Sequence, residues 1–170
     1  SVETQLDVYL SSPRGLCAGV VRAVDIVEIA LERFGAPVYV KHQIVHNPHV
    51  VKALEDKGAL PVEDVDEIPE GSNVAFSAHG SAPSDFEKAH DRNLNIIDAT
   101  CPLVTRVHNE AKKYRREGKK VILVGHRGHQ EVVGTMGQTD MALLDEREEF
   151  DLPDWEDDQQ VAVLTQTTLS

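Results

Sequence analysis

The chain has 170 residues, of which 41% are hydrophobic, and its formal net charge is -12. This is enough apolar material for one large domain or two small ones, while the negative charge argues against a nucleic-acid partner, because phosphate backbones need a clustered basic surface. No apolar run reaches the length of a membrane helix and no basic, then apolar, leader opens the chain, so the expected location is the cytoplasm.

Short runs rich in Val, Ile and Leu predict six strands, which cover residues 7–10, 37–40, 73–77, 95–99, 120–124 and 161–165. Apolar residues at helical spacing predict helices over residues 18–34, 48–57, 85–92 and 103–117. Asn47 followed by Pro48 is a typical helix start, and Gly35 is a typical stop. Strands that alternate with helices in this way predict an α/β fold with mainly parallel sheets flanked by helices.

The loops that follow the predicted strands hold the residues with useful chemistry. In chain order they read SPRGLCAG, HQIVHN, SAHGS, ATCP, GHRGHQE and TQTTLS. Open parallel sheets bind ligands beyond the carboxyl ends of their strands, so these loops predict one composite site. A lone histidine is more often a hydrogen-bonded structural residue. That role is the one expected for His42, His49, His90 and His108.

The chain has two cysteines, Cys17 and Cys101, which are too few for a disulfide framework. Each is expected to follow a strand and to begin a helix, where unpaired N–H groups and the helix macrodipole stabilise a thiolate. Thiolates bind soft metals, but the wide separation of the two excludes a CxxC knuckle. A metal cluster would therefore be assembled from different loops and would need a further ligand. The alternative is that both thiols are small buried hydrophobic residues.

Histidine and hydroxyl groups supply the other half of the predicted site, because they can donate hydrogen bonds to an oxyanion such as phosphate or diphosphate. The candidates are His46, His79, His129, Thr167, Thr168 and Ser170. Glu131 lies near His129 in a glycine-rich turn and is a candidate proton donor. The alternative is that Glu131 only caps a helix that begins near His129.

The sequence contains only parts of several other catalytic and binding motifs. His129-Gln130-Glu131 matches the H-x-E of zinc deaminases, but their P-C-x-x-C is missing. The chain contains neither a GxxxxGK[ST] loop nor a GxGxxG after the first strand. Three alternatives stay open: a Cys–His hydrolase with Cys101 as nucleophile, a zinc protein using two Cys and two His, and a module that binds a phosphorylated metabolite.

Six ordered segments resemble the 4-hydroxy-3-methylbut-2-enyl diphosphate reductase family, the LytB/IspH enzymes that end the non-mevalonate isoprenoid pathway. They are PRGLCAGVVRAV, APVYVKHQIVHN, FSAHG, DATCPLVTRVH, GHRGHQEVVGTMGQ and TQTTLS, and they span essentially the whole chain. Only residues 139–160 look variable.

The resemblance implies a cloverleaf of three α/β domains around a 4Fe-4S iron-sulfur cluster held by three cysteines, one per lobe. Cys17 and Cys101 match the first two, and Glu131 matches the glutamate that delivers a proton. The substrate hydroxyl binds the iron that lacks a cysteine, and two electrons and protons expel it as water, giving isopentenyl and dimethylallyl diphosphates. The residues that match the diphosphate-binding motifs are His46, His79, His129, Thr167 and Thr168.

The resemblance also implies that the chain is a fragment. Residues 13–100 would form the first lobe and residues 101–170 the second, while residues 1–12 would pack with a missing third lobe. The third cysteine and a later Ser/Asn motif would lie beyond Ser170, so the fragment alone is expected to hold a cluster poorly and to be nearly inactive. The complete enzyme would take electrons from a small carrier such as ferredoxin or flavodoxin.

Overall fold

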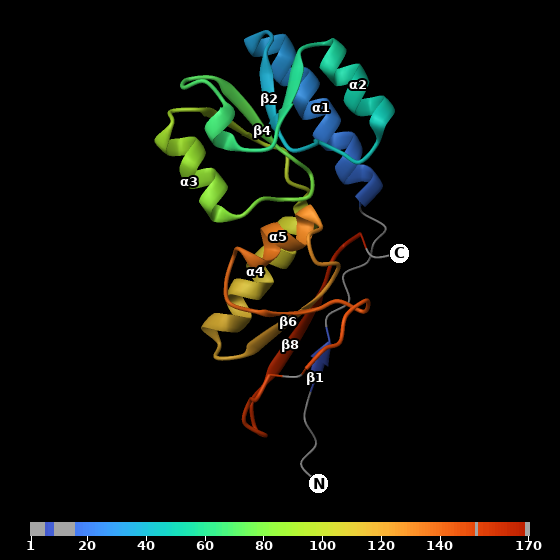
Figure 1. Ribbon diagram of the computed structural model, residues 1–170, viewed down its shortest axis with the longest axis vertical. Coiled ribbons are helices and arrows are strands. Elements are labelled where there is room, and N and C mark those ends of the chain that lie inside the picture. The colour runs from blue at the N-terminus through green and yellow to red at the C-terminus, as the bar shows by residue number, and fades with distance from the viewer. Residues whose placement is uncertain (1–5, 9–15, 152, 169–170) are drawn as a thin grey trace.

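The computed structural model describes residues 6–8, 16–151 and 153–168. In this part of the chain two four-stranded sheets, all of whose pairings are parallel, build two lobes that lie one above the other in Figure 1. The predicted α/β fold with parallel sheets flanked by helices is confirmed. None of the helices in the described ranges combines the length and apolar character that a membrane span requires.

The first lobe is a sheet of order β3-β2-β4-β5 with helices on both faces. Its strands are β2 (Val38–Lys41), β3 (Ala59–Val62), β4 (Asn73–Phe76) and β5 (Asn95–Asp98). Its helices are α1 (Leu16–Phe34), α2 (Pro48–Asp56), the 3₁₀ turn η2 (Val65–Glu67) and α3 (Pro83–Asp91). Ala75 packs with Val27 of α1, whereas Val74 and Phe76 pack with Ala89 of α3. This alternation along β4 buries both faces of the sheet, as is usual for parallel strands.

The second lobe is a sheet of order β1-β8-β6-β7 with α4 (Pro102–Arg116) and α5 (Gln130–Met136). Its strands are β1 (Leu6–Val8), β6 (Lys120–Val124), β7 (Ala142–Leu144) and β8 (Val161–Thr165). Val107 of α4 and Val132 of α5 pack on Leu123 and Leu164 of the two central strands. The apolar positions of the 103–117 pattern therefore face the core as predicted.

The sequence prediction missed two strands, and both lie at the edge of a sheet. Strand β3 contains Pro61, which lacks the N–H that an inner strand would use in its ladder. Strand β7 has only three residues and lies inside the stretch 139–160 that looked variable. Edge strands need little apolar patterning, and this is why neither was recognised.

Strand β1 pairs in parallel with β8, with Leu6 opposite Val161. The described part of the segment 1–12 thus lies at the edge of the second sheet, and the rest of that segment lies outside the described residues. That residues 1–12 pack with a third lobe stays a prediction, as do the limits 13–100 and 101–170.

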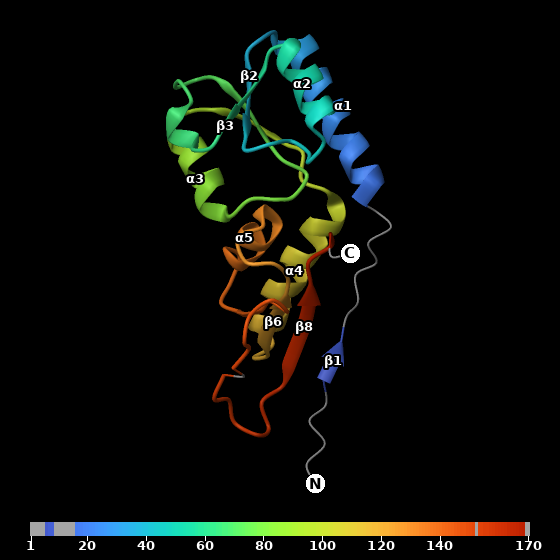
Figure 2. The same cartoon turned by 45° about the vertical axis from the view of Figure 1, so that its right-hand side comes forward.

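The two lobes meet through the loop 77–82, which leads from β4 to α3 (Figure 2). A Cβ at Gly134 of α5 would lie 3.2 Å from the carbonyl carbon of Gly80, so two backbones approach closely here. Gln130 Nε2 donates to Ser77 Oγ at 3.0 Å, and Gln138 Nε2 donates to the Ser81 carbonyl at 3.1 Å. The junction is therefore a packed and hydrogen-bonded contact.

His108 of α4 lies beneath this loop, where a Cβ at Gly80 would be 2.9 Å from its Cε1. Burial, and then the charge of Lys112, lower the pKa of His108 to about 4. Between pH 4 and pH 6.5 His108 is therefore protonated more in the unfolded chain, where a histidine pKa is about 6.5, than in the folded chain. We expect the free energy of unfolding to fall as the pH is lowered from about 6.5 toward 4.

The replacement His108→Leu should remove part of this pH dependence. It removes no hydrogen bond of Nε2, because this buried atom has no partner among the described residues. His79 has a pKa lowered in the same direction, so a residual slope should remain. Urea unfolding at several pH values measures the slope, and equal slopes for the variant and the parent would contradict the prediction.

Candidate functional site

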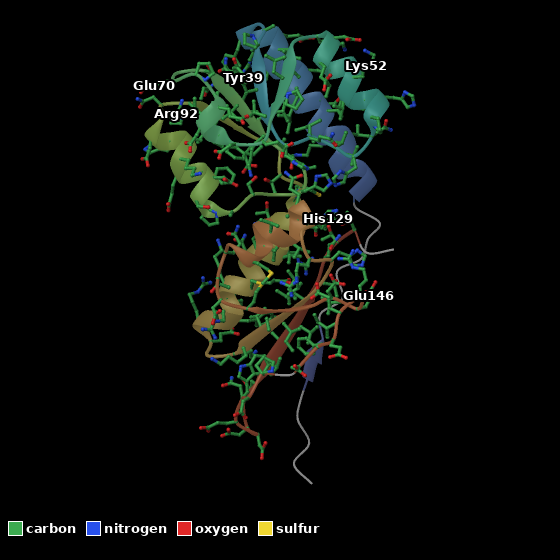
Figure 3. The ribbon with its side chains drawn as sticks, viewed as in Figure 1. Tyr39, Lys52, Glu70, Arg92, His129 and Glu146 are labelled. Carbon is green, nitrogen blue, oxygen red and sulfur yellow. The ribbon has the colours of Figure 1, made fainter. Side chains whose placement is uncertain are left out.

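Three of the predicted ligand residues meet at the lobe junction. His46 follows β2, His79 follows β4, and His129, labelled between the lobes in Figure 3, follows β6. The ring centroids of His46 and His79 are 4.1 Å apart, and His129 lies 5.3 Å from the first and 5.7 Å from the second. We call these residues the histidine cluster. Strand-end loops from both lobes contribute to it, which is the arrangement expected when the carboxyl ends of two sheets face each other.

The histidine cluster is held uncharged by its surroundings. The side chain of His79 is 2% exposed, and burial first, followed by the neighbouring imidazoles, lowers its pKa to about 3. Burial also lowers the pKa of His46 and of His129. At neutral pH the three rings are therefore polar donors and acceptors rather than cations. In the part of the chain that the structure describes, the buried Nδ1 of His79 has no hydrogen-bond partner, so this nitrogen could bind a further group.

Glu131 lies in α5 with its side chain directed at the end of β8. It is 2% exposed, and its carboxylate accepts hydrogen bonds from the Thr167 N–H at 2.6 Å and from Thr168 Oγ1 at 3.0 Å. Burial raises its pKa, and the hydrogen bonds from the two threonines oppose this rise. A carboxyl group with a raised pKa keeps its proton to higher pH and can deliver it to a bound molecule.

The contacts of Glu131 do not agree with the alternative that it only caps a helix. The N-cap of α5 is His129, whose Nδ1 accepts a hydrogen bond from the Glu131 N–H at 3.1 Å. One imidazole of the histidine cluster is thereby oriented by the backbone of the buried acid. The helix start joins the two groups into one site.

Sequence reasoning missed Gln166, which is 5% exposed and links the loop after β6 to Thr168 through hydrogen bonds. Its Nε2 donates to Thr168 Oγ1 at 2.7 Å, and its Oε1 accepts from the His126 N–H at 3.0 Å. Gln166 therefore orients the hydroxyl that contacts Glu131. The only signal in the sequence was its place inside TQTTLS, where the neighbouring hydroxyl residues were the predicted ligands.

Cys101 lies beside the histidine cluster and is a free thiol with 2% exposure. Its N–H donates to the Ala78 carbonyl at 3.0 Å, next to His79, and it is the N-cap of α4 without making a side-chain cap bond. A Cβ at Gly19 of α1 would lie 2.5 Å from its Sγ. The N-terminal part of α1 and the start of α4 thus meet at this sulfur.

Cys17 belongs to the first turn of α1, two residues before Gly19, but its side chain lies outside the part that the structure describes. Ser170 lies outside it altogether. Within the described residues, no group of three or more His, Cys, Asp or Glu side chains is arranged to hold a metal ion. The structure therefore brings α1, which carries Cys17, to Cys101 without defining a complete ligand set.

Two of the histidines expected to be structural have clear contacts of that kind. His42 pairs through Nδ1 with Glu63 Oε2 at 2.9 Å, and His108 is buried in α4. A pocket of about 390 Å³ is lined by Ser81, His108 and Lys112 among others, and it contains none of the candidate site residues. The chemistry predicted from the sequence lies elsewhere at the junction.

Known proteins resemble this chain over nearly its whole length. The family model described as LytB protein matches residues 8–170. The chain is 56% identical over 165 residues to 4-hydroxy-3-methylbut-2-enyl diphosphate reductase of Acidothermus cellulolyticus, covering 96% of this chain and 48% of that protein. It is 54% identical over 169 residues to the protein of that name from Mycolicibacterium paratuberculosis, covering 98% and 51%.

Solved structures give the same result. The E-1-hydroxy-2-methyl-but-2-enyl-4-diphosphate reductase of Plasmodium falciparum superposes with a TM-score of 0.80 at 40% identity, over 96% of this chain and 52% of that one. The chain spans about half the length of the curated relatives it matches. Because the family model covers nearly every residue, the chain belongs to the LytB/IspH family.

Proposed function

We propose that the complete protein is a 4-hydroxy-3-methylbut-2-enyl diphosphate reductase and that this chain supplies about half of it, including most of the groups that bind substrate and move protons. The observation that carries the proposal is the meeting of three imidazoles, whose pKa values burial lowers, with a buried carboxyl group whose pKa burial raises. Such a site can bind a polyanion and protonate a leaving hydroxyl without a permanent positive charge.

Cys17 and Cys101 would supply two of the three cysteine ligands of a 4Fe-4S cluster. Cys101 is free and buried, and the absent side chain of Gly19 leaves room for its sulfur against α1, the helix that contains Cys17. These two residues would hold the cluster together with a third cysteine from the remainder of the complete protein. When bound, the cluster supplies electrons and a Lewis-acidic iron for the substrate hydroxyl.

The histidine cluster would bind the diphosphate. Among the described residues the buried Nδ1 of His79 has no hydrogen-bond partner, and a phosphate oxygen would satisfy such a group. His46 and His129 lie within ring contact of His79 and can donate to the same anion. A dianionic group in this position would raise the pKa of each imidazole and oppose the effect of burial.

Glu131 would deliver a proton to the leaving hydroxyl. The reaction replaces a C–O bond by a C–H bond, so it consumes two electrons and two protons and releases water. Glu131 is suited to one proton transfer because burial raises its pKa and the Thr167 N–H and the Thr168 hydroxyl fix its orientation. Thr168 is in turn held by Gln166. A small electron carrier such as ferredoxin or flavodoxin and a cytoplasmic location complete the proposal.

Anaerobic purification of the complete protein tests the cluster. We expect a brown protein with iron and sulfide, and we expect Cys17→Ser and Cys101→Ser each to abolish the visible absorption. His90→Gln, at an exposed site on α3, is the matched control. Colourless protein with stoichiometric zinc would support the zinc-protein alternative, and protein with neither metal would support a phosphometabolite-binding module.

The variant Glu131→Gln tests proton delivery. Its amide oxygen can still accept from the Thr167 N–H, but the side chain has no ionisable proton. Turnover should fall by roughly a hundredfold or more, while iron content and diphosphate affinity stay near those of the parent. Unchanged turnover would reduce Glu131 to a structural role. Glu87→Gln, on the exposed part of α3, is the control.

The lowered pKa values of the histidine cluster predict that diphosphate binding takes up protons. The imidazoles are uncharged in the free protein and gain protons when the anion raises their pKa, so affinity should rise as the pH is lowered from about 8 toward 6. Calorimetry with inorganic diphosphate in buffers of different ionisation enthalpy counts these protons. The variant His46→Gln should take up fewer, and an equal uptake would contradict a direct role of His46.

A further inference from the structure

One face of α1 contacts the turn that carries Cys101. Gly19 lies against the sulfur, and Arg22, one helical turn later, donates from Nη1 to the Thr100 carbonyl at 3.0 Å. Residues three apart share a helix face, so both contacts come from the same side of α1. We propose that Gly19 and Arg22 act as a clamp that positions Cys101 as a cluster ligand, an inference that rests on the proposed function.

Gly19 determines how close the sulfur lies to α1. A Cβ at this position would be 2.5 Å from Cys101 Sγ and 3.1 Å from Cys101 Cβ, which is inside van der Waals contact. The residue lies within α1, where alanine is the better helix former. Local helix formation therefore gives no reason for glycine here, and the contact with the sulfur does.

Arg22 fixes the backbone that precedes the sulfur. The Thr100 N–H donates to Asp98 Oδ1 at 2.9 Å, and the Cys101 N–H donates to the Ala78 carbonyl at 3.0 Å. The Thr100 carbonyl lies between these two N–H groups along the backbone, and it accepts the hydrogen bond from Arg22. The turn is thus held by β5, by the loop 77–82 and by α1.

The clamp explains how two cysteines far apart in the sequence serve one cluster. Cys17 is in the same helix as Gly19 and Arg22. Contacts that hold Cys101 against this helix therefore also set the position of Cys101 relative to the backbone of Cys17. Gly19 and Arg22 are positioning residues, since neither is a ligand. Their loss should change the occupancy and the stability of the cluster.

A double-mutant cycle in the cluster-free complete protein tests the contact without reference to iron. Gly19→Ala should lower Tm by several degrees when residue 101 is Cys, because the new methyl group displaces the sulfur. In the Cys101→Ala background the same change should leave Tm unchanged or raise it, because the sulfur is gone and alanine suits the helix. Equal shifts in both backgrounds would overturn the clamp.

Iron binding tests the consequence. In the anaerobically reconstituted complete protein, Gly19→Ala should lose more than half of its iron and the matching visible absorption. Arg22→Gln should release iron to a chelator several times faster than the parent, and Arg22→Lys should restore part of the difference. The control Arg33→Gln, at an exposed position near the end of α1, should release iron at the parental rate. Parental iron content and release rates in the Gly19 and Arg22 variants would overturn the clamp. Parent protein without iron would overturn the proposed function itself, together with the clamp's role toward the cluster.

Discussion

The close approach of the loop 77–82 to the second lobe is the constraint on which the rest of the site depends. A Cβ at Gly80 would lie 2.9 Å from His108 Cε1, and one at Gly134 would lie 3.2 Å from the Gly80 carbonyl. This loop presents His79 to His46 and His129 and, through the Ala78 carbonyl, holds the N–H of Cys101. If the two backbones were further apart, the imidazoles, the carboxyl group and the thiol would not share one junction.

Burial at this junction works on acid and base in the same direction, toward the uncharged form. It lowers the pKa of His79 to about 3 and raises the pKa of Glu131. A chain with a net charge of -12 would repel a diphosphate at long range, so binding must come from short, directed hydrogen bonds. In the proposed function neutral imidazoles would suit this task, because an approaching anion would raise their pKa.

The sequence allowed the strand-end loops to be predicted because parallel strands and their polar ends leave a local pattern, and the structure brings His46, His79 and His129 together from them. Other features depend on tertiary contacts that no local pattern reports. Gln166 matters through its bonds to Thr168 and to the His126 N–H, and β3 exists because β2 offers it an edge. The local setting made Cys17 and Cys101 candidate metal ligands and Glu131 a candidate proton donor, while the expected iron-sulfur cluster came from the family resemblance alone.

Glycine inside a helix is the one sequence signal that points to these contacts. Helix propensity disfavours it, so an internal glycine indicates that something else needs the space. Gly134 makes room for the backbone of Gly80 in the other lobe, and Gly19 makes room for the sulfur of Cys101. Both glycines lie in helices that border the junction, α5 and α1. In this protein two residues that weaken a helix locally, Gly19 and Gly134, let α1 approach the sulfur of Cys101 and let α5 approach the loop of the other lobe.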